Sequence, residues 1–85
     1  MKLENVLSMI MAECDRAERI HPVWPKNLIH AGMIVSEESG ELCQSILNHN
    51  ERKGSKQAII TEAIHTAAMA IRFLKNINDE EISHE

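Results

Sequence analysis

Apolar residues recur at steps of three and four along most of this chain, the spacing that places them on one face of an α-helix. The pattern is interrupted at 21–25, where two prolines break a helix, and at 48–55, which is polar and contains a glycine. The sequence therefore predicts an all-α fold, and an antiparallel helical bundle would bury its apolar stripes. We expect three helices, from Leu3 to about Ile20, from a cap at Asn27 to 48–50, and from Ser55 or Lys56 to about Ile77.

The chain has 85 residues, of which 44% are hydrophobic, so we expect a single domain over 1–85. A domain of this size leaves about a third or more of its unfolded surface exposed, which favours completion of the bundle by oligomerisation, as a homodimer or a dimer of dimers. Cys14 and Cys43 lack CxxC spacing and are expected as small core residues in a reducing compartment. The acidic segment 78–85 is expected to be a short helical turn or a frayed tail.

Charge and hydropathy exclude two classes of partner. Thirteen acidic and nine basic residues give a formal net charge of -4, which provides no basic field for a nucleic-acid backbone. The chain has no long apolar run and no signal-peptide cleavage pattern, so neither a membrane span nor secretion is predicted. A cytoplasmic protein is the expectation.

Two motifs place metal-capable side chains three residues apart on predicted helices. Glu38 and Glu41 form the first pair, and Glu62 and His65 form the second. Because residues at i and i+3 are neighbours on a helix surface, each pair can face one cation. Carboxylates inside apolar helices favour neutralisation by a cation, and Mg²⁺ prefers hard oxygen ligands. Glutamate pairs on a solvated helix face are also common, so the motifs alone leave that alternative open.

The segments 37–42 (EESGEL) and 62–68 (EAIHTAA) resemble the MazG-like, all-α nucleoside triphosphate pyrophosphohydrolases, over roughly residues 22–77. The resemblance implies a MazG-like helical bundle that cleaves a (deoxy)nucleoside triphosphate between the α and β phosphates, in nucleotide-pool cleansing, with bound Mg²⁺. It implies Glu38 and Glu41 as catalytic residues. It implies metal ligands at Glu38, Glu41, Glu62 and His65.

The chain departs from that family at His65, where the family has an aspartate. Imidazole is a softer ligand than carboxylate and suits Mg²⁺ poorly. His65 would then bind Mn²⁺ or another transition metal, contact a phosphate from outside the metal shell, or mark a lost activity. The rival functions follow from this departure. They are a non-catalytic helical dimer for metal or nucleotide sensing or for protein interaction, and a phosphoribosyl-ATP pyrophosphohydrolase-like enzyme.

Four further residues are candidate substrate contacts. Arg72 and Asn76 follow His65 on the same helical face, and the guanidinium of Arg72 suits bidentate phosphate contact. Lys56 is a candidate phosphate ligand, and Trp24 is a candidate platform for a stacked base. Each has a structural alternative: Arg72 and Lys56 as solvated side chains, and Trp24 as a core plug or interface anchor.

Overall fold

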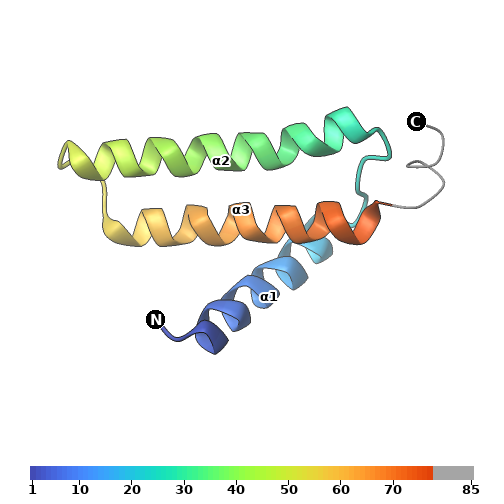
Figure 1. Cartoon of the computed structure of the whole chain (residues 1–85), viewed down its shortest axis with the longest axis horizontal. Helices are drawn as coiled ribbons and strands as arrows, with labels where there is room; N and C mark the ends of the chain where they lie inside the picture. The colour runs from blue at the N-terminus through green and yellow to red at the C-terminus, as the bar shows by residue number, and fades with distance from the viewer. Residues whose placement is uncertain (78–85) are drawn as a thin grey trace.

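The computed structural model describes residues 1–77, which form three helices and no strand (Figure 1). Helix α1 spans Leu3–Ile20, α2 spans Leu28–Asn50 and α3 spans Lys56–Asn76. The all-α prediction is confirmed, and the predicted helix bounds agree with these to within about a residue. The expected tail at 78–85 lies outside the described residues.

Helix α3 is the central element of the fold. Helices α2 and α3 run antiparallel, side by side, and α1 crosses α3 near the C-terminal end of α3 (Figure 1). Within the described chain, α1 and α2 both pack on α3 but not on each other. A cavity lined by residues of all three helices lies over α3.

The helix ends follow from local capping. The Asn27 side chain accepts a hydrogen bond from the His30 backbone N–H at 2.9 Å, and the Ser55 hydroxyl accepts one from the Ala58 N–H at 3.1 Å. The turn between α2 and α3 passes through a left-handed residue at Arg52, with φ of 63°. A side chain at position 54 would be crowded, because a Cβ added to Gly54 would lie 3.1 Å from the Asn48 side chain.

The core is built mainly from small side chains. Its buried members are Cys14, Ala17, Ala68 and Met69, with partly buried apolar residues around them. Small residues at the contact between α1 and α3 allow the two backbones to approach closely, and Ala68 is completely buried. None of the large side chains among residues 1–77 is fully buried, so the hydrophobic core of a single chain is thin.

The prediction that both cysteines are core residues is wrong for one of them. Cys14 is buried and its Sγ lies 3.7 Å from the Ala68 carbonyl oxygen, whereas Cys43 is exposed on α2. Ser45 is buried on the face of α2 that turns inward. Cys43 lies two residues before Ser45, which is about 200° around an α-helix, so its side chain points outward.

No helix within residues 1–77 is both long enough and apolar enough to cross a bilayer.

Candidate metal-binding site

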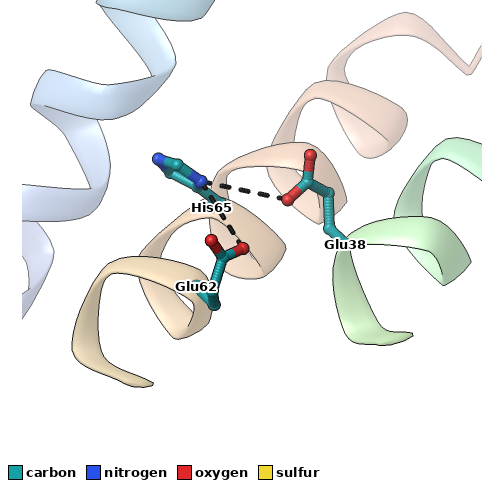
Figure 2. Close-up of side chains that lie close together, drawn as sticks. All are labelled: Glu38, Glu62 and His65. Atoms are coloured by element: carbon teal, nitrogen blue, oxygen red, sulfur yellow. Dashed lines mark ion pairs between the residues drawn. The ribbon is translucent and has the colours of Figure 1, made fainter. Parts of the chain in front are cut away.

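Three side chains from two helices that line this cavity converge on one another (Figure 2). Glu38 comes from α2, and Glu62 and His65 come from neighbouring turns of α3. One ligand atom from each lies within 4.8 Å of the others. His65 Nδ1 is 3.9 Å from Glu38 Oε2 and 3.8 Å from Glu62 Oε2. The structure thus brings together three of the four predicted metal ligands.

The burial of the two carboxylates indicates what this cluster can hold. The side chains of Glu38 and Glu62 are 25% and 24% exposed, yet the Oε2 atom of each is buried and has no hydrogen-bond partner in the described part of the chain. A buried carboxylate oxygen without a donor is costly, and two of them here face the same point. Two carboxylates and an imidazole are a suitable donor set for a divalent cation. The residues therefore fit a bound metal ion.

The proton affinity of Glu38 reflects the same environment. Burial raises the pKa of its carboxyl above the usual value, and the neighbouring charges of Glu41 and Glu62 raise it further, while His65 opposes the shift. A cation at the cluster would favour the ionised form of Glu38 and reverse this effect. Glu41 itself is exposed and lies outside the converging trio, although it lines the same cavity.

Helix α1 adds a carboxylate that sequence reasoning did not find. Glu13 Oε2 lies 3.6 Å from Nε2 of His65, whereas Glu38 and Glu62 lie near the other ring nitrogen, Nδ1. Arg16 holds Glu13 through two hydrogen bonds of 2.7–2.8 Å, and these are the main reason that the pKa of Glu13 is lowered. The only sequence signal was an opposite-charge pair at i and i+3, which is common on solvated helices.

A cavity of about 340 Å³ lies over the trio and extends to the junction between α1 and α2. Its acidic end holds Glu38, Glu41 and Glu62, and Arg16 and Arg72 supply positive charge on its other walls. Such a cavity, negative where the cation would bind and positive nearby, suits a ligand that carries phosphates to a metal ion.

Arg72 is buried, not solvated. Its side chain belongs to a residue only 4% exposed, and Nη2 donates a hydrogen bond of 2.6 Å to the His21 carbonyl oxygen. Its guanidinium carbon lies 4.9 Å from the centroid of the Trp24 ring, within range of a cation–π contact. Nε has no partner within residues 1–77. Trp24 packs against the core cluster and on Arg72, which favours its core-plug alternative.

The other two predicted substrate contacts lie away from the trio. Lys56 is exposed at the start of α3, about 9 Å along the helix axis from Glu62. Asn76 donates its side-chain N–H to the Arg72 backbone carbonyl at 2.8 Å. Neither residue lines the cavity.

Comparison of the whole chain with protein-family models, with curated proteins and with solved structures gave no match. The MazG-like resemblance rests on the residues of the two motifs alone. The geometry of this site is therefore the main guide to its chemistry.

Proposed function

We propose that this protein is a metal-dependent nucleoside triphosphate pyrophosphohydrolase, which converts a (deoxy)nucleoside triphosphate to the monophosphate and pyrophosphate. The observation that carries the proposal is the pair of buried, unpartnered carboxylate oxygens on Glu38 and Glu62, which meet Nδ1 of His65 at one point. These residues belong to the two motifs that suggested the activity. Glu38 comes from α2, and Glu62 and His65 come from α3.

The side chains that line the cavity would have different roles in the reaction. Glu38, Glu62 and His65 would hold the cation, which, when bound, supplies phosphate charge neutralisation and a lowered pKa for an attacking water. Glu41 lines the cavity and is exposed, and it would orient that water and accept its proton. Arg72 would offer its guanidinium to the phosphates.

The experiment that tests the proposal is pyrophosphate release from a panel of ribo- and deoxynucleoside triphosphates and phosphoribosyl-ATP, with Mg²⁺ and then with Mn²⁺. We expect Glu41→Gln to lower turnover by about 10²–10⁴-fold, because it removes a proton acceptor, and to leave the helical circular dichroism spectrum unchanged. Glu37→Gln, an exposed neighbour outside the cavity, is the matched control. Turnover retained in Glu41→Gln would contradict the assigned role.

We also propose that the working form is a homodimer or a dimer of dimers. The Cα radius of gyration is 14.6 Å, against about 12 Å for a compact domain of this length, and the core of one chain is thin. An apolar groove of about 400 Å³ runs between α2 and α3 on a surface separate from the metal cavity. Phe73 and Leu74 line it, and the α2 residues Ile29 and Met33 are exposed as well. A second copy would bury these side chains and complete the bundle.

Light scattering should therefore give at least twice the mass of one chain. Leu74→Glu places a charge on the groove, so we expect it to shift the protein toward monomer and lower the melting temperature. Leu3→Glu is the control, because Leu3 is equally exposed but lies on α1, outside the groove. Dissociation by Leu3→Glu alone would place the interface elsewhere.

A non-catalytic helical dimer is the second candidate, and one observation favours it. His65 lies within ion-pair distance of Glu13, Glu38 and Glu62, so a charged imidazole would offset one of these three carboxylates with no metal bound. The two functions differ in their response to divalent ions. A metal enzyme gains thermal stability as cation occupies the site, whereas this scaffold would not.

A further inference from the structure

We propose that Glu13 of α1 is a positioning residue that orients the His65 imidazole, so that Nδ1 serves as the metal ligand. This inference rests on the metal site of the proposed function and assigns a role to a residue outside both sequence motifs.

The two ring nitrogens of His65 face opposite partners. Figure 2 shows Nδ1 turned toward the carboxylates of Glu38 and Glu62, and the other ring nitrogen turned away from them. That second nitrogen, Nε2, faces Glu13 Oε2 at 3.6 Å. When a cation offsets the charges of Glu38 and Glu62 beside Nδ1, the carboxylate of Glu13 beside Nε2 favours the tautomer that carries the proton on Nε2, which leaves the lone pair of Nδ1 directed at the cation.

Glu13 is itself held in place. Arg16 Nε donates to Glu13 Oε1 at 2.8 Å, and Arg16 Nη2 donates to Glu13 Oε2 at 2.7 Å. The Glu13 side chain is only 12% exposed. A fixed, charged carboxylate can restrain the ring on α3 even though the two residues are far apart in the chain, because α1 packs on α3 and brings Glu13 beside His65.

The 3.6 Å contact is longer than a hydrogen bond, but its arrangement is that of a common metal-site device, in which a ligating histidine directs its other N–H at a carboxylate. It also gives the departure from the family motif a physical reason. An aspartate carboxylate has no ring to orient, whereas an imidazole has a second nitrogen whose partner fixes the orientation of the ring. Two independent features indicate that the cavity accepts a ligand: the unpartnered Oε2 atoms of Glu38 and Glu62, and the unpartnered Nε of the buried Arg72 that lines it.

The test is Mn²⁺ binding by the full chain without nucleotide, measured by titration calorimetry. Glu13→Gln should weaken Mn²⁺ binding by about 10–100-fold, the usual effect of removing such a partner. Asp15→Asn, an exposed acidic residue on the same helix, removes the same charge and should leave the affinity within about threefold. Circular dichroism of each variant checks the fold.

A double-mutant cycle separates orientation from simple charge. In a His65→Asp background there is no ring to orient, so Glu13→Gln should change Mn²⁺ affinity by less than about threefold. An equal loss in both backgrounds would mean that Glu13 acts only through its negative charge, and would overturn the proposal. So would unchanged Mn²⁺ affinity in Glu13→Gln, or no Mn²⁺ binding by the unaltered protein.

Nitrogen-15 NMR of the imidazoles gives a second readout, with His65→Asn used for assignment. With the diamagnetic ion Zn²⁺ bound, we expect Nδ1 to be the ligating nitrogen and Nε2 to carry the proton, and we expect loss of that preference in Glu13→Gln; ligation through Nε2 in the unaltered protein would overturn the proposal. The result is independent of the activity. A protein that shows this coupling but releases no pyrophosphate would retain the role of Glu13 and lose the proposed function.

Discussion

Glu38→Gln should abolish the rise in melting temperature that divalent ions produce, and pyrophosphate release should fall at least about 100-fold with it. A ligand at 100 times its dissociation constant stabilises the folded state by about 2.7 kcal/mol. For a domain of this length that corresponds to about 10–20 °C in melting temperature, at roughly 4–8 °C per kcal/mol. Glu38→Gln should lose this gain, because the amide removes the charge that binds the cation. The measurement is a thermal melt with and without Mn²⁺.

The same substitution should stabilise the metal-free protein at neutral pH. The pKa of Glu38 is raised on folding, mainly by burial, so the folded state binds this proton more tightly than the unfolded state does. Stability therefore falls as pH rises from the ordinary value of 4.5 through the raised one, and the unaltered protein bears this loss at pH 7. Glu38→Gln has no such group, so its advantage should appear at pH 7 and vanish below 4.5.

Urea unfolding in a chelator at both pH values measures this difference. Hydrogen bonds from Arg16 and Lys75 are the chief reason that the pKa values of the Glu13 and Glu18 carboxyls are lowered. Protonation of these two carboxyls in acid therefore lowers the stability of the fold. They are present in both proteins, so their contribution cancels in the comparison. A Glu38→Gln protein that is less stable than the unaltered one at pH 7, without metal, would show that Glu38 stabilises the fold through contacts of its own.

The sequence predicted what depends on neighbours in the chain. Helix caps at Asn27 and Ser55 are local hydrogen bonds, and the approach of Glu62 to His65 follows from one helical turn. Glu38 was correctly expected to join them from a facing helix, because α2 and α3 form an antiparallel pair joined by a short loop.

The parts that the sequence did not predict depend on where α1 crosses α3. Glu13 meets His65 only because of that crossing, and no periodicity in either helix encodes it. The sequence left two interpretations of Arg72, a phosphate contact or a solvated side chain. Neither includes its hydrogen bond to the His21 carbonyl oxygen, which joins residues 51 positions apart. The prediction that Cys43 is buried is wrong, because the apolar residues of α2 do not show which side of that helix α3 will cover.

Arg72→Ala should lower the free energy of unfolding by about 2–4 kcal/mol. The substitution removes a hydrogen bond from a charged donor to the His21 carbonyl oxygen, worth about 1.5–3 kcal/mol, and the cation–π contact with Trp24, worth about 0.5–2 kcal/mol. Arg19→Ala is the control, because Arg19 is an exposed arginine near the end of α1 and should contribute about 1 kcal/mol or less. Urea unfolding of the metal-free proteins gives both values.

Arg72→Lys separates the two roles that Arg72 can have. Lysine keeps the positive charge near the cavity but lacks the planar fork that reaches the His21 carbonyl while lying over Trp24. If Arg72 is chiefly the link between α1 and α3, Arg72→Lys loses stability and keeps its KM for nucleotide. If it chiefly binds phosphate, KM rises while stability stays near that of the unaltered protein. The burial of Arg72 and its contacts at the end of α1 favour the first result, so contact of its unpartnered Nε with phosphate would be the lesser of its two roles.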